Sequence, residues 1–129
     1  MKHVALILLL LTIPLVAEDQ DSVPEPSQRP DASYRLFRTR NIYTFLKLDT
    51  RTGEVWQIQW GKYADVVPIN VARLGDGNRA GRFTLYPTQN IYAFILLDQE
   101  YGRQWFVQWN PDPEKRFIEP IEASPPKAP

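Results

Sequence analysis

Two aspartates at corresponding places are the residues of this sequence best suited to acid–base chemistry. Asp49 and Asp98 are each followed, four residues later, by a glycine. Two carboxyl groups held close together across a sugar can act as general acid and base in glycoside hydrolysis. An aspartate that opens a glycine turn, however, accepts hydrogen bonds from the backbone of that turn. Because this turn role accounts for both aspartates, we predict no catalytic residue.

Residue types that serve other catalytic or metal sites are scarce. The chain has no cysteine, and its one histidine is His3. Thiol nucleophiles, disulfides and Ser–His–Asp triads are therefore excluded beyond the N-terminal segment, as are most zinc, copper and iron sites. Asp76-Gly77-Asn78 has the start of a calcium-loop pattern but lacks the further spaced acids. We predict no metal, no cofactor and no enzymatic activity.

Both aspartates belong to a stretch that occurs twice, 49 residues apart. Between residues 37–60 and 86–109, eleven of 24 aligned positions are identical. The identical pairs are Thr39/Thr88, Asn41/Asn90, Ile42/Ile91, Tyr43/Tyr92, Phe45/Phe94, Leu48/Leu97, Asp49/Asp98, Gly53/Gly102, Trp56/Trp105, Gln59/Gln108 and Trp60/Trp109. Such self-similarity indicates that one unit of supersecondary structure is repeated.

Each copy has the alternation of β-strands. Residues 42–49 and 91–98 are apolar on both faces, which is typical of a central strand. The strands that follow, 55–60 and 104–109, place their tryptophans on one face. Turns that begin at the aspartates and contain Gly53 and Gly102 join these strands as hairpins. Further strands are expected at 34–38, 65–72, 82–86 and 115–121.

The fold class predicted is all-β, with two tandem antiparallel meanders of three to four strands. We expect them to pack as a pseudo-two-fold sandwich or a small barrel. Its core would contain the four tryptophans, Trp56, Trp60, Trp105 and Trp109. Forty-nine residues is also the size of one propeller blade. Propellers typically need 4–8 blades, so this second alternative requires an oligomer.

The residues that we single out for ligand binding are tyrosines and glutamines of the same strands. They are Tyr43, Gln57, Gln59, Tyr92 and Gln108. The glutamines lie opposite the tryptophan stripe and would form a polar groove with Lys47 and Tyr43. The alternative is an ordinary solvent face with cross-strand amide pairs. The tryptophans themselves could instead stack on sugars or peptides.

The two ends of the chain differ in composition from the repeats. Residues 1–17 have a basic start, an apolar run and a small residue, as in a signal peptide; a retained anchor is the alternative. We expect a disordered acidic and Pro-containing linker at 18–33 and a Pro-rich tail at 122–129. The single folded domain would cover 34–121, with copies at about 34–74 and 82–121.

The repeated motif resembles that of a group of small exported bacterial proteins of the Bacteroides type. The motif runs Thr-x-Asn-Ile-Tyr-x-Phe-x-x-Leu-Asp-x-x-x-Gly-x-x-Trp from Thr39 and again from Thr88. Its Leu-Asp-x-x-x-Gly-x-x-Trp portion is also similar to the blade motif of quinoprotein-type propellers. The resemblance implies export and a β-repeat fold, and it supplies no activity.

The sequence thus favours an exported non-enzymatic binding module, located in the periplasm or outside the cell. Its ligand is not identified; a glycan, a peptide or an envelope protein are the candidates. The alternative is a structural protein that self-associates through β edges, and a small carboxylate-dependent hydrolase comes last. Nucleic acid is not expected as a partner, since no run of Lys or Arg exceeds two residues. No integral span is expected in the mature chain.

Overall fold

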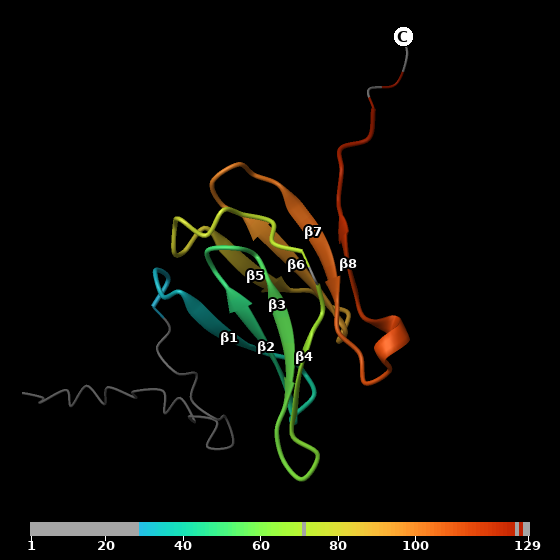
Figure 1. The fold of residues 1–129 in the computed structure, drawn as a ribbon. Coiled ribbons are helices and arrows are strands. Elements are labelled where there is room, and N and C mark those ends of the chain that lie inside the picture. Colours follow the sequence, from blue (N-terminus) through green and yellow to red (C-terminus); the bar gives the residue numbers. More distant parts are fainter. Residues whose placement is uncertain (1–28, 71, 126, 128–129) are drawn as a thin grey trace, which may run out of the picture.

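The computed structural model describes residues 29–70, 72–125 and 127, which form two antiparallel four-stranded sheets (Figure 1). The first sheet consists of β1 (Tyr34–Arg38), β2 (Thr44–Asp49), β3 (Val55–Gln59) and β4 (Asp65–Pro68). The second consists of β5 (Phe83–Pro87), β6 (Ala93–Asp98), β7 (Gln104–Gln108) and β8 (Phe117–Pro120). A short 3-10 helix, η1 (Pro113–Lys115), precedes β8. The all-β class and the two tandem meanders packed together are confirmed.

Strand order follows chain order in both sheets, so every hydrogen-bonded neighbour is also a sequence neighbour. The first three strands of the second sheet begin and end 49 residues after those of the first. The registers agree as well: Leu46 faces Gln57 in the first sheet, and Ile95 faces Phe106 in the second. The two halves of the chain thus form the same meander.

Aspartate and glycine close the central hairpin of each sheet. The N–H of Gly53 donates to the carbonyl of Asp49 over 2.9 Å, and that of Gly102 donates to Asp98 over 2.8 Å. Both glycines have positive φ angles, +77° and +72°. A Cβ would strain this backbone, which explains glycine at both positions.

The sheets pack through faces that do not correspond to each other. In the first sheet the buried side chains include Leu46, Leu48 and Val55. In the second, the residues at the matching positions point outward, and the opposite face is buried. That face contributes Phe83, Leu85, Phe94, Leu96, Trp105, Val107 and Trp109 to the core. A two-fold relation would bury the same face of each copy, so the packing is head-to-tail instead.

Two strands are shorter than expected, because a side chain ends the ladder of β4 and a 3-10 helix precedes β8. β4 stops at Pro68 rather than at residue 72. The N–H of Val55 donates to Oδ1 of Asn70 over 2.8 Å, where a continued strand would offer a carbonyl. In the second sheet η1 takes up the start of the predicted strand 115–121, so β8 begins at Phe117.

The predicted signal peptide, residues 1–17, and most of the predicted linker lie outside the described residues. The end of the linker is described and contacts the first hairpin. Thr50 Oγ1 donates to the carbonyl of Ala32 over 2.7 Å, and the Thr50 N–H donates to that of Ser33 over 2.9 Å. In the part of the chain that the structure describes, no helix has the length and apolar character needed to cross a membrane.

Candidate binding surface

The outward side of the first sheet is rich in aromatic and aliphatic side chains. Strand register places ten residues on this surface, which we call the first outer face. They are Tyr34, Leu36, Arg38, Phe45, Lys47, Trp56, Ile58, Trp60, Val66 and Pro68. Tyr34, Leu36, Trp60 and Val66 are each about half exposed. A contiguous apolar area of this kind is typical of an interaction site.

Cationic side chains lie across the aromatic rings of the first outer face. The Lys47 ammonium is 4.6 Å from the centre of the Trp56 ring and 5.9 Å from that of Tyr34. Arg51 donates to the Tyr34 hydroxyl over 3.1 Å. The Arg38 guanidinium is 5.8 Å from the Phe45 ring. The surface therefore combines apolar area with positive charge held at fixed places.

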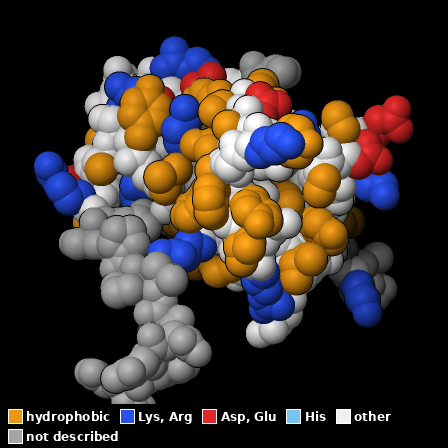
Figure 2. Space-filling view, turned by 90° about the horizontal axis from the view of Figure 1, so that it is seen from below, with side chains coloured by type: hydrophobic (Ala, Val, Ile, Leu, Met, Phe, Trp, Pro, Cys, Tyr) orange, Lys and Arg blue, Asp and Glu red, His pale blue; other side chains and the backbone are white. Residues whose placement is uncertain are grey.

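Trp60 and Tyr43 form the end of this face that adjoins the β1–β2 turn. Their rings are 5.3 Å apart, and Trp60 Nε1 donates to the carbonyl of Ile42 over 2.8 Å. Asn41 Oδ1 accepts from the N–H of Tyr43 over 2.9 Å, which fixes the turn. Seen from below the view of Figure 1, hydrophobic side chains gather over the middle of the molecule, with Lys and Arg around them (Figure 2).

The outward side of the second sheet is a further apolar surface, which we call the second outer face. Strand register places on this side Thr84, Tyr86, Ala93, Ile95, Leu97, Gln104, Phe106, Gln108, Phe117 and Glu119. Thr84 and Ala93 are buried there. Tyr86 and Ile95 are exposed, and the Phe106 and Phe117 rings pack edge to face at 5.2 Å. No Lys or Arg lies among these ten residues.

The glutamines predicted to bind ligand lie on different sides of the molecule. Gln57 is only 3% exposed, between the sheets, where its Oε1 accepts from the Asn110 N–H over 3.1 Å. Gln59 is partly buried on the same side of the first sheet. Gln108 lies on the second outer face and donates to the Lys115 carbonyl over 2.9 Å. These three side chains do not form a common groove.

The two tyrosines differ in exposure although their turns are alike. Tyr43 is about half exposed beside Trp60, at the edge of the first outer face. Tyr92 is partly buried, with its ring 5.1 Å from that of Trp109. Of the five predicted ligand residues, only Tyr43 therefore adjoins the first outer face.

The four tryptophans divide between core and surface. Trp105 and Trp109 are buried in the core. Trp56 is partly buried on the first outer face, and Trp60 is 51% exposed. The expectation of a core position is corrected for Trp60, and Trp56 packs on the outside of its sheet. The reason is the head-to-tail packing, which turns the tryptophan stripe inward in one sheet and outward in the other.

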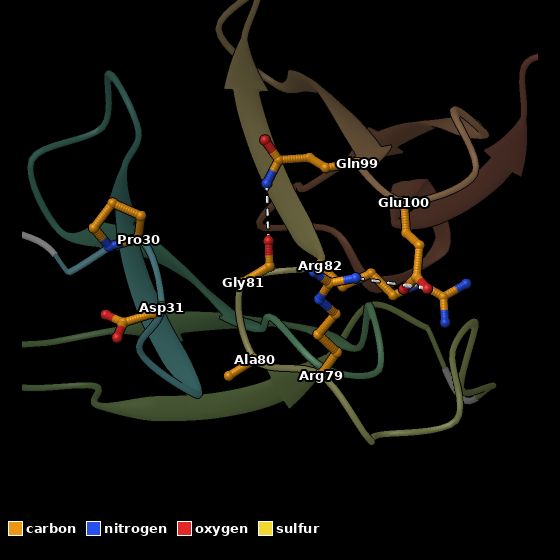
Figure 3. Close-up of a pocket in the computed structure, with 8 residues that line it drawn as sticks. All are labelled: Pro30, Asp31, Arg79, Ala80, Gly81, Arg82, Gln99 and Glu100. Carbon is orange, nitrogen blue, oxygen red and sulfur yellow. Dashed lines mark hydrogen bonds and ion pairs between the residues drawn. The ribbon is translucent and has the colours of Figure 1, made fainter.

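Asp98 lies beside a charged pocket but has no free capacity for acid–base chemistry. The pocket, about 410 Å³, is lined by Arg79, Arg82, Gln99 and Glu100 and by residues 30–31 and 80–81 (Figure 3). Arg82 Nε and Nη2 each donate to Asp98 over 3.0 Å, and Arg103 Nη2 donates over 2.9 Å. Burial alone would raise the pKa of Asp98. These bonds and two backbone N–H groups outweigh burial and hold it well below its ordinary value.

Asp49 has the same turn role, but one arginine binds its carboxylate where two bind that of Asp98. Its carboxylate accepts from Arg51 Nε over 3.0 Å, from Nη2 over 2.9 Å and from the Arg51 N–H over 2.9 Å. Burial alone would raise the pKa of Asp49, but the hydrogen bonds and the charge of Arg51 lower it by more, so the net direction is downward. Both aspartates are carboxylates occupied by their own turns. Within the described residues, no group of three or more His, Cys, Asp and Glu side chains could hold a metal ion.

Sequence reasoning placed Lys47 in a groove with the glutamines, and it missed Arg38 as a residue of the candidate site. The aligned copies contain a signal for them: Arg38 and Lys47 stand where the second copy has Pro87 and Leu96. Long cations in one copy and apolar residues in the other indicate which copy exposes that face. Comparison of the chain with protein-family models, curated proteins and solved structures finds no match.

Proposed function

We propose that this protein is an exported, non-enzymatic binding module, and that its ligand is the surface of another polypeptide. The first outer face is the binding site. The observation that carries the proposal is the exposure of Tyr34, Leu36 and Trp60 together on one sheet face. Export rests on the composition of residues 1–17.

The arrangement of the rings favours a protein ligand over a glycan. Stacking on a sugar requires a flat and open aromatic face. The rings of Trp56 and Tyr34 lie under Lys47, and Trp60 packs against Tyr43. What is left is broad apolar area with cations among the rings. Aromatic residues and arginine are enriched at the centres of protein interfaces.

The strand edges are less suited to binding than the face. β1, β4, β5 and β8 are the four edge strands. Three of them end in a proline: Pro68, Pro87 and Pro120. Proline cannot donate a ladder hydrogen bond and hinders the addition of a strand. This observation favours contact through the face over self-association through β edges.

Site-specific photo-crosslinking tests the proposal. Leu36 is replaced by p-benzoylphenylalanine in cells that produce the protein, and Tyr63 is replaced in a matched control. Both side chains are exposed, but Tyr63 lies in the loop after β3 and outside the face. We expect a polypeptide adduct from position 36 and none from position 63. Absence of any adduct, or equal adducts from both positions, would overturn the proposal.

A further inference from the structure

Head-to-tail packing inside the molecule leaves two complementary faces outside it. The interior joins the inner face of the first sheet to the opposite face of the second. Each outer face therefore corresponds, at a spacing of 49 residues, to a face that is buried in the interior. A two-fold sandwich would bury the same face of each copy, so no outer face would correspond to a buried one.

The first outer face has nearly the composition of the buried face of the second sheet. Six apolar positions match in kind. They are Tyr34/Phe83, Leu36/Leu85, Phe45/Phe94, Trp56/Trp105, Ile58/Val107 and Trp60/Trp109. The second members of these pairs are all in the core, whereas Tyr34, Leu36 and Trp60 are about half exposed. The first outer face thus has the side chains of a core surface without a sheet packed on it.

The second outer face matches the buried face of the first sheet in the same way. Tyr86, Ile95 and Leu97 stand where the first copy has Phe37, Leu46 and Leu48. Phe106 replaces the buried Gln57, which makes the outer surface more apolar than the inner one at that point. Both halves of the internal interface are therefore present a second time, on the outside.

Direct contacts show how one sheet sits on the next. Arg35 Nη1 donates to Thr84 Oγ1 over 3.5 Å, and Arg40 Nη1 donates to the Gln89 carbonyl over 3.0 Å. Each bond joins a residue to the one 49 positions later, its counterpart in the other copy. The two sheets are thus displaced from each other by one repeat, and a further sheet on either outer face would continue the same displacement.

We infer that the partner of the first outer face is the second outer face of another copy of this chain. The inference rests on the proposed function, whose partner it names. Heterologous contacts of this kind close into a ring when the rotation per unit allows it. Propellers typically close with 4–8 sheets, which corresponds to roughly two to four molecules of this chain.

Charge distinguishes the contact between molecules from the contact within one. Arg38 and Lys47 lie on the first outer face. Glu119 lies on the second, opposite Phe106, at the place that Val67 has in the first sheet. The two outer faces are therefore opposite in charge. Opposite charges favour this pairing over the contact of either face with itself.

Light scattering after size exclusion, over a range of protein concentrations, tests the inference on the purified protein. We expect a closed oligomer of two to four chains for the unchanged protein. Trp56→Glu on the first outer face and Ile95→Glu on the second should each give the single-chain mass. Tyr63→Glu, outside both faces, should leave the oligomer intact. A single-chain mass for the unchanged protein at all concentrations would overturn the inference.

Mixing the two face variants is the decisive step. Each variant keeps one intact face, so an equimolar mixture of Trp56→Glu and Ile95→Glu should form a dimer with one restored contact. Mixing cannot restore a two-fold contact, because that contact joins two identical faces. A mixture that stays at the single-chain mass therefore shows no contact between the first and the second outer face, and it overturns the inference.

Two further variants cover the case in which a charged substitution unfolds the chain. Circular dichroism checks the fold of each variant, and Leu36→Lys at a half-exposed position replaces Trp56→Glu if that variant is unfolded. Lys47→Glu, which places a negative charge on the first outer face, should weaken association with the face that contains Glu119; stronger association would contradict the charge match between the faces. If the purified chain is a monomer and the crosslink at position 36 contains a different protein, the binding module stands and the self-partner falls.

Discussion

Replacing Asp98 by asparagine should destabilise the protein far more than the same change at Asp49. Both aspartates open a glycine turn, and both accept from arginine and from backbone N–H groups. They differ in the burial of the arginine. Arg82, which binds Asp98, has a side chain only 6% exposed, whereas that of Arg51 is 34% exposed.

The magnitude follows from what each asparagine would leave behind. Asp98→Asn keeps one acceptor oxygen, places an amide against the buried Arg82 guanidinium and removes the carboxylate closest to it, which leaves Glu100 at 3.5 Å and Asp76 at 3.8 Å. Loss of one partner of a buried ion pair costs about 3–5 kcal/mol. Glu100, 3.5 Å from Arg82, supplies partial compensation, so we expect about 3 kcal/mol. At Asp49 water can solvate Arg51, and about 1 kcal/mol is expected.

Urea unfolding followed by circular dichroism, at one fixed protein concentration, measures both changes. A loss of about 3 kcal/mol corresponds to a fall of roughly 15 °C in Tm for a domain of this size. The pKa of Asp98 is lower in the folded protein than its ordinary value of 3.8. Its contribution to the free energy of unfolding is therefore full above that ordinary value and is lost as the pH falls through the folded-state pKa. The gap between the unchanged protein and Asp98→Asn should narrow accordingly below about pH 4. Equal losses for the two variants at neutral pH would refute the role given to burial.

Two other pairs of equivalent residues give further predictions. Trp109→Ala should lower the free energy of unfolding by about 3–5 kcal/mol and Trp60→Ala by less than about 2 kcal/mol, since Trp109 is 1% exposed and Trp60 is 51% exposed. Urea unfolding at protein concentrations that give the single-chain mass measures both changes, and equal losses would contradict the prediction. Gly102→Ala should cost about 1–2 kcal/mol through its positive φ. Gly53→Ala should cost more, because its Cβ would lie 3.1 Å from the Phe83 ring whereas that of Gly102 meets open space; thermal unfolding that ranks Gly102→Ala as the costlier change would be the contrary result.

Strand positions could be predicted because they depend on local pattern. Alternation and turn glycines placed β1 at Tyr34–Arg38 and the hairpins at Asp49–Gly53 and Asp98–Gly102, as the structure has them. The end of β4 could not be predicted in this way. Asn70 ends the ladder with a side-chain amide, and a sequence does not show that a side chain will substitute for a backbone carbonyl.

Burial of a given face could not be predicted, because it depends on which sheet packs on which side. Phe45 and Leu46 are both apolar, so the pattern of β2 permits either face to turn inward. Trp60 and Trp109 each pack against a tyrosine ring and each donate from Nε1 to the carbonyl of an isoleucine. Trp60 is nevertheless 51% exposed, whereas Trp109 is 1% exposed. The candidate site follows from that packing, which is why the glutamines singled out from the strand pattern do not mark it.

The consecutive order of strands has a kinetic consequence. Paired residues within either sheet are at most 15 positions apart, as for Tyr34 with Asp49 and Trp105 with Pro120. Local pairings form early because they need little loop closure, and the docking of one sheet on the other then comes last. Until that step the inner faces of both sheets are open, and they match the outer faces of any neighbouring molecule. Refolding at high concentration therefore places correct docking in competition with the capture of a sheet from another chain, and the yield of correctly folded protein should depend on dilution more than on the speed of strand formation.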